Sequence, residues 1–151
     1  MDIAGHQKIK ASQQRVFQGI LNPEILQQCL PGCQTAEYVD LPEGRQIKIL
    51  ISPNFPGFKG PYTIYLQPTE VVAPSHIVLQ AAPSSSIGSI KTLCKIDLAE
   101  EGAFTNLVYN ASTVLEGKIA NTPEFIIKTA VKGAMDHFFK NFEKLIGTTQ
   151  A

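Results

Sequence analysis

The sequence feature that most constrains the fold is a change in the spacing of apolar residues along the chain. From about residue 34 to residue 115 they recur at every second position, as Ile47, Ile49 and Ile51 do around Lys48 and Leu50. Such alternation is typical of strands that bury one face. Similar runs occur at 62–67, 76–81, 90–97 and 106–113, separated by turn-forming clusters at 41–44, 53–61, 68–74, 83–88 and 100–102. We therefore expect a meander of antiparallel strands.

Two short helices are expected before this region. Residues 2–10 fit a first strand, and Ser12 is a suitable N-cap for a helix that carries Val16, Phe17, Ile20 and Leu21 at helical spacing. A second short helix is expected from Asn22-Pro23-Glu24, because Asn can cap and Pro suits the first helical position. Pro31-Gly32 is expected to end it.

A long helix is expected after the strands. Thr122 can cap it, Pro123 suits its first position, and Gly147 is expected to end it. One apolar stripe consists of Ile127, Val131, Ala134, Phe138, Phe142 and Leu145. The charged residues Lys128, Lys132, Asp136, Lys140 and Lys144 recur on the outer side, most simply as a solvated face. The order of elements predicts an α+β fold, in which a curved antiparallel sheet wraps around the long C-terminal helix, with two short helices after the first strand.

Length and charge narrow the class of protein. A chain of 151 residues fits one domain over residues 1–151, with 147–151 as a frayed tail. Because 13 Lys and Arg balance 13 Asp and Glu, and only 17% of residues are charged, we expect no nucleic-acid partner. No run is long and apolar enough for a transmembrane segment, and the N-terminus does not resemble a secretory signal. We expect a cytoplasmic protein.

Few residues suggest catalytic or metal chemistry. Cys29 and Cys33 have a zinc-like spacing, but four ligands are normally required, so packing is the better explanation and we expect no metal and no cofactor. His76 and His137 have no nucleophile close in sequence, so we expect no catalytic residue and no enzyme activity. Gly57 and Gly60 fit turns and match no phosphate-binding loop.

Several short motifs, in order, resemble one protein family. They are Gly5, Val16-Phe17, Asn22-Pro23-Glu24, Cys29-Leu30-Pro31-Gly32-Cys33, Phe58-Lys59-Gly60, Thr105-Asn106-Leu107-Val108-Tyr109 and Phe138-Phe139. With them, the chain resembles the carbon monoxide dehydrogenase G-subunit family, within the START/polyketide cyclase (SRPBCC, helix-grip) superfamily.

The resemblance implies a deep, mostly apolar cavity between the sheet and the C-terminal helix, and relatives that bind lipids, isoprenoids or aromatic compounds. It also implies a link to a molybdenum hydroxylase, as an accessory factor in maturation or membrane recruitment of a molybdenum-containing carbon monoxide dehydrogenase. We expect first a non-catalytic carrier or sensor of a hydrophobic small molecule or lipid, with peripheral contact at the inner face of the membrane. The accessory role is the alternative, and a cyclase or hydrolase is a weaker one.

Inward-facing residues of the sheet can be either core or cavity wall, and both interpretations need the same side chains. Thr92, Tyr109 and Thr113 place polar atoms on this inner face, where buried polar groups need partners from protein, water or a ligand. The predicted ligand-binding residues are Ile49, Ile51, Phe55, Phe58, Tyr62, Ile64, Leu79, Cys94, Leu107, Tyr109, Ala111, Phe125, Ile126 and Ala130.

The loop at residues 53–61 carries two aromatic residues, Phe55 and Phe58, among Pro and Gly. One interpretation is that both fold back and plug one end of the core. The other is that they form a lid over the cavity, with Lys59 placed to meet an anionic headgroup. Both remain open at the level of the sequence.

Overall fold

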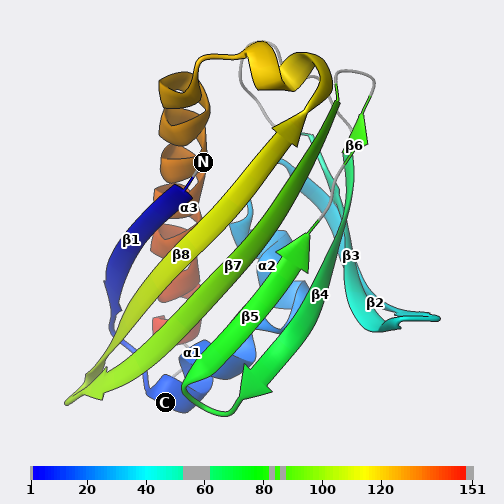
Figure 1. Ribbon diagram of the computed structural model, residues 1–151. Helices are drawn as coiled ribbons and strands as arrows, with labels where there is room; N and C mark the ends of the chain where they lie inside the picture. Colours follow the sequence, from blue (N-terminus) through cyan, green and yellow to red (C-terminus); the bar gives the residue numbers. More distant parts are fainter. Residues whose placement is uncertain (1, 53–61, 82–83, 86–87, 149–151) are drawn as a thin grey trace.

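The computed structural model describes residues 2–52, 62–81, 84–85 and 88–148 (Figure 1). The elements are β1 (Asp2–Ile9), α1 (Gln13–Ile20), α2 (Pro23–Cys29), β2 (Cys33–Leu41), β3 (Gly44–Ile51), β4 (Tyr62–Val72), β5 (His76–Ala81), β6 (Ser84–Ser85), β7 (Gly88–Glu101), β8 (Phe104–Glu116), η1 (Gly117–Asn121) and α3 (Glu124–Thr148).

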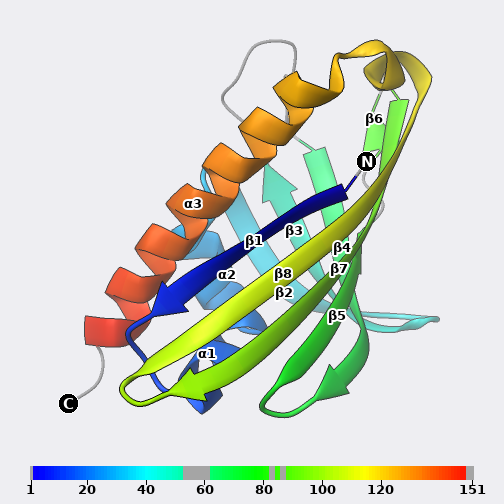
Figure 2. The same ribbon diagram turned by 60° about the vertical axis from the view of Figure 1, so that its left-hand side comes forward.

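One antiparallel sheet contains all the described strands. Its order is β1-β8-β7-β5-β4-β3-β2, and the short β6 pairs with β7 outside this path. Figure 2 shows α3 running diagonally along one side of the curved sheet, with α1 and α2 near its C-terminal end. The expectation of an α+β fold, with a curved sheet around a long C-terminal helix and two short helices after the first strand, is confirmed.

Both short helices begin at the predicted caps. The Ser12 hydroxyl accepts a hydrogen bond from the Arg15 backbone N–H at 3.3 Å. The Asn22 side chain accepts one from the Glu24 N–H at 3.0 Å, and Pro23 occupies the first turn of α2. Each cap satisfies one of the backbone donors that a helix leaves unpaired at its N-terminus, so the local sequence fixes where these helices start.

Two expected boundaries differ in the structure. The sequence predicts a turn at 68–74, but β4 continues through Pro68 to Val72, with a register shift between Pro68 and Glu70. Beyond Leu66 the β4 residues pair only with β5. Pro68 is tolerated because it lies where one edge of β4 is unpaired and the register shifts, and proline occurs in sheets at such edges and bulges. At the other end of the chain, α3 extends one residue past Gly147 to Thr148.

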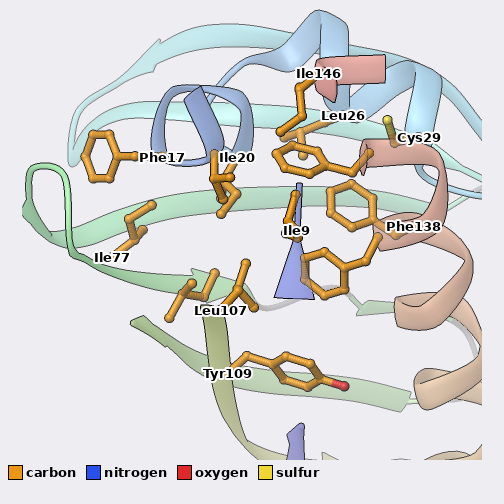
Figure 3. Packing of buried hydrophobic residues seen from close by; sticks show 14 of the residues in the cluster. Ile9, Phe17, Ile20, Leu26, Cys29, Ile77, Leu107, Tyr109, Phe138 and Ile146 are labelled. Atoms are coloured by element: carbon orange, nitrogen blue, oxygen red, sulfur yellow. The ribbon is translucent and has the colours of Figure 1, made fainter. Parts of the chain in front are cut away.

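The packed core lies where α1, α2 and the C-terminal half of α3 meet the sheet. Figure 3 shows Phe17 and Ile20 of α1, Ile77 of β5 and Phe138 of α3 converging on this region. Gly19 permits the close approach of α1 to α3, because a Cβ atom there would lie 2.8 Å from Cζ of Phe142. This end of the interior is filled with large apolar side chains.

The edge strand β2 is paired with β3 on one side and hydrogen-bonded to a side chain of α2 on the other. Nε2 of Gln27, in α2, donates to the Gln34 carbonyl at 3.2 Å, and its Oε1 accepts from the Ala36 N–H at 3.3 Å. A single amide therefore makes both kinds of hydrogen bond that a neighbouring strand would make.

Candidate functional site

The inner face of the sheet becomes less buried from one end to the other. On β7, Leu98 and Ile96 are buried, whereas Cys94 and Thr92, further toward the start of the strand, are half-buried. The same change from buried to half-buried occurs at Ile47, Ile49 and Ile51 of β3, and at Ile77, Leu79 and Ala81 of β5. At this end, therefore, the inner positions of three strands remain partly accessible to solvent.

Helix α3 shows a parallel change along one row of its surface. Residues four apart lie on the same helix face, and the row Ala130, Ala134, Phe138, Phe142 begins with two half-buried alanines and ends with two buried phenylalanines. Since β8 ends at Glu116 and α3 begins at Glu124, the alanine end of α3 lies near the end of β8. Figures 1 and 2 show the start of α3 close to the end of β8. On this row of α3, side-chain volume therefore decreases toward that end of the sheet.

Small side chains on the sheet lie side by side at this end. Thr92 of β7 pairs with Ala81 of β5 on one side and with Thr113 of β8 on the other, and Cys94 pairs with Ala111. We call the following set the small-residue region: Ala81, Thr92, Cys94, Ala111 and Thr113 of the sheet, with Ala130 and Ala134 of α3. Isoleucine, leucine or phenylalanine would be expected there if the interior were packed like the other end.

The side chain of Cys94 is partly accessible to solvent although its thiol is strongly desolvated. Burial raises the pKa of its thiol to about 11, yet the side chain is only half-buried. Desolvation disfavours the charged form of a thiol, so the surroundings of Cys94 are of low polarity and the thiol is neutral at pH 7. Burial also raises the pKa of the thiols of Cys29 and Cys33. None of the three has the lowered pKa that marks a reactive nucleophile.

Tyr109 lies between the small-residue region and the packed core. It is 3% exposed and stacks on Phe139 with ring centroids 5.9 Å apart. Its ring lies over Gly5, the residue directly opposite on β1. A Cβ atom at position 5 would be 2.6 Å from the Tyr109 hydroxyl. Burial, with a smaller contribution from Asp136, raises the pKa of the phenol, so the Tyr109 side chain is neutral at pH 7.

The predicted ligand-binding residues fall into four groups. Half-buried and inward-facing are Ile51, Tyr62, Ile64, Leu79, Cys94, Ala111 and Ala130. Fully buried among the core residues are Ile49, Leu107 and Tyr109. Exposed on α3 are Phe125 and Ile126, at 70% and 45%. Outside the described residues are Phe55 and Phe58.

The structure does not bring Phe125 and Ile126 into the interior. Ile127 is buried, and Phe125, two residues before it, lies about 200° away around the helix. Ile126 is on the row of Ala130, but one turn closer to the start of α3, where its side chain is exposed. Conversely, Ala134 is a half-buried residue of the candidate site that the predicted ligand-binding set does not include. Its signal is present in the sequence, because it follows Ala130 by four residues on the row that continues to Phe138.

A histidine cluster lies outside this region. His76, at the opposite end of β5, has Nδ1 2.6 Å from Oδ1 of Asp97 and Nε2 3.2 Å from Oε2 of Glu70. The hydrogen bond to Asp97, more than that to Glu70, raises the pKa of the imidazole. Among the described residues, no three His, Cys, Asp or Glu side chains are arranged to hold a metal ion.

Within the described ranges, no helix has the length and hydropathy needed to cross a membrane.

Comparisons with known proteins give a family and a fold. The sequence matches the carbon monoxide dehydrogenase G-subunit family (CoxG) over residues 5–147. A search of curated proteins gives no match.

Solved structures resemble the chain over almost its whole length. A conserved protein from Geobacillus kaustophilus has a TM-score of 0.89 at 24% identity, covering 99% of this chain and 97% of the other. A START superfamily protein from Mycobacterium smegmatis has a TM-score of 0.72 at 13% identity, covering 97% of each. The di-domain ARO/CYC BexL has a TM-score of 0.72 at 12% identity, covering 95% of this chain and 49% of that protein. The solved structures show a START-like architecture, and the match over residues 5–147 shows that this chain belongs to the carbon monoxide dehydrogenase G-subunit (CoxG) family.

Proposed function

We propose that the protein binds a hydrophobic small molecule or lipid between the sheet and the N-terminal half of α3, as a non-catalytic carrier or sensor. The observation that carries this proposal is the small-residue region, where half-buried small side chains of three strands lie at the end of the sheet near which α3 begins with its two alanines. A tightly packed interior would be expected to hold large side chains at these positions, as it does around Phe142.

The driving force would be transfer of apolar surface out of water. Each Å² of apolar area removed from water contributes about 25 cal/mol. The described walls supply apolar contact from Ile51, Ile64 and Leu79, together with the methyl groups of the alanines. Ligand sites of this kind are mostly apolar with a few polar groups that fix orientation.

The test is native mass spectrometry of freshly purified protein, followed by solvent extraction and by titration with the neutral dye Nile red. We expect a co-purified apolar molecule or uptake of the dye. Ala134→Phe should fill the space and remove binding. The matched control is Ala99→Phe on the exposed side of β7, which should bind like the unmodified chain. If the unmodified protein carries nothing and takes up no dye, the proposal fails.

Family membership favours a second role, as accessory factor for maturation or membrane recruitment of a molybdenum-containing carbon monoxide dehydrogenase-like enzyme. Co-purification of the tagged chain with such an enzyme from its native cells tests this role. Failure to co-purify, with no such enzyme encoded near the gene, would remove the support for it.

We also propose peripheral contact with the inner face of a membrane. The exposed side chains of Phe125 and Ile126, next to Lys128 on α3, support it. Sedimentation with anionic vesicles tests this contact.

A further inference from the structure

Two threonine hydroxyls meet on the inner wall of the small-residue region. Thr92 and Thr113 are directly opposite each other on β7 and β8, and their Oγ1 atoms are 3.4 Å apart. Thr113 is 8% exposed and Thr92 is half-buried. A threonine hydroxyl offers one donor and two acceptor sites, and the bond to Thr113 uses only one of the three sites of Thr92.

Thr105, another threonine of β8, is an example of a hydroxyl whose hydrogen bond is purely structural. Thr105 is completely buried, and its hydroxyl donates to the Ala11 carbonyl at 2.7 Å. Thr92, in contrast, has no hydrogen-bond partner but Thr113 among the described residues, and that bond is long. Its hydroxyl therefore keeps hydrogen-bonding capacity on a largely apolar wall.

The surroundings select against a charged ligand group. Cys94 neighbours Thr92 on the inner side of β7, and its thiol is held neutral by desolvation. The same desolvation would act on a carboxylate brought to this wall, whereas a neutral hydroxyl or carbonyl would be penalised far less. The polar atoms at hand can donate to such a group or accept from it.

The order of residues along β8 also orients a ligand. From Thr113 the inner positions continue through Ala111 to Tyr109, about 14 Å away at the usual rise of a strand. The phenylalanines of α3 lie beyond Tyr109. A molecule with one polar end would place that end at the threonines and its apolar body toward Tyr109.

Building on the proposed function, we propose that Thr92 and Thr113 form a head-group site for a neutral oxygen-bearing amphiphile, an alcohol or carbonyl compound, with the apolar body pointing toward Tyr109. The ligand class is therefore uncharged at the head, and fatty acids in their ionised form are poor ligands.

Three probes with the same chain length separate head from body: 1-dodecanol, dodecanoate and 1-bromododecane, each measured by displacement of Nile red at pH 7.4. We expect dodecanol to bind at least about tenfold more tightly than dodecanoate. In the double variant Thr92→Val, Thr113→Val, dodecanol should weaken about fivefold to tenfold, the size of one hydrogen bond, while 1-bromododecane is unchanged. Thr63→Val, on the exposed face of β4, is the matched control.

Two results would overturn the head-group site. One is dodecanoate binding as tightly as dodecanol, and the other is dodecanol affinity that the double variant leaves unchanged. Unchanged binding of 1-bromododecane by the variant shows that its interior is intact. If the dye and all three probes fail to bind the unmodified protein, the proposed function fails with the head-group site, so the two failures are distinguishable.

Discussion

Replacing Gly5 by alanine tests the packing of Tyr109 against β1. The new Cβ would lie 2.6 Å from the hydroxyl oxygen, 2.7 Å from Cζ and 3.0 Å from Cε1 of Tyr109. The ring cannot easily move away, because Tyr109 is buried and stacked on Phe139. Overpacking of this kind costs about 1–3 kcal/mol. Alanine itself stabilises the folded state by about 0.5–1 kcal/mol relative to glycine, because glycine loses more backbone entropy when a strand forms. We expect a net loss of stability of up to about 2.5 kcal/mol.

The same substitution should behave differently once the ring is absent. In a Tyr109→Leu background the three clashing atoms do not exist, so Gly5→Ala should stabilise the fold by about 0.5–1 kcal/mol. The double-mutant cycle should therefore show a coupling of about 1–3 kcal/mol. The chain has no Trp, so unfolding in urea is best followed by far-UV circular dichroism. An equal loss of stability in both backgrounds would refute the steric explanation.

Two further predictions concern α3 and the histidine cluster. Phe142→Ala should lower the free energy of unfolding by about 3–5 kcal/mol, because Phe142 is fully buried. Phe125→Ala, at an exposed position, should change it by less than about 0.5 kcal/mol. Equal urea midpoints for the two variants would contradict the placement of α3. The hydrogen bond to Asp97 raises the pKa of His76, so protonation of the imidazole is favoured in the folded chain. The stabilisation from the protonated imidazole is therefore complete below the unfolded pKa of about 6.5. It disappears as pH rises through the folded pKa. The stability difference between the unmodified chain and His76→Gln should therefore be larger at pH 6 than at pH 8.5, and a difference independent of pH would show that the cluster does not bind the proton more tightly.

The features predicted correctly from the sequence depend on neighbours in the chain. The caps at Ser12 and Asn22 need only a backbone N–H two or three residues away. The alternation around Ile47 and Ile49 indicates the buried face of a strand, and this holds whichever strands pair with it. Such local signals are sufficient for the element order and for the α+β fold.

The features that were missed depend on contacts between distant segments. In the sequence, Pro68 indicates a turn. Only the pairing of β4 shows that one edge of this strand is open at Pro68, so that the strand can continue. The exposure of Phe125 depends on the rotation of α3 about its axis relative to the sheet. The packing of the core phenylalanines determines that rotation. The meeting of Thr92 with Thr113 follows from the register of β7 and β8, which no local pattern specifies.

The amide of Gln27 has a consequence for the behaviour of the chain in concentrated solution. A strand edge with free N–H and C=O groups is a template for another chain, and β2 would present such groups near Gln34 and Ala36. Since α2 already supplies a donor and an acceptor there, an approaching strand would first have to displace a side chain anchored on a helix. The helix that closes one end of the core thereby also keeps neighbouring molecules from adding to the sheet at this edge.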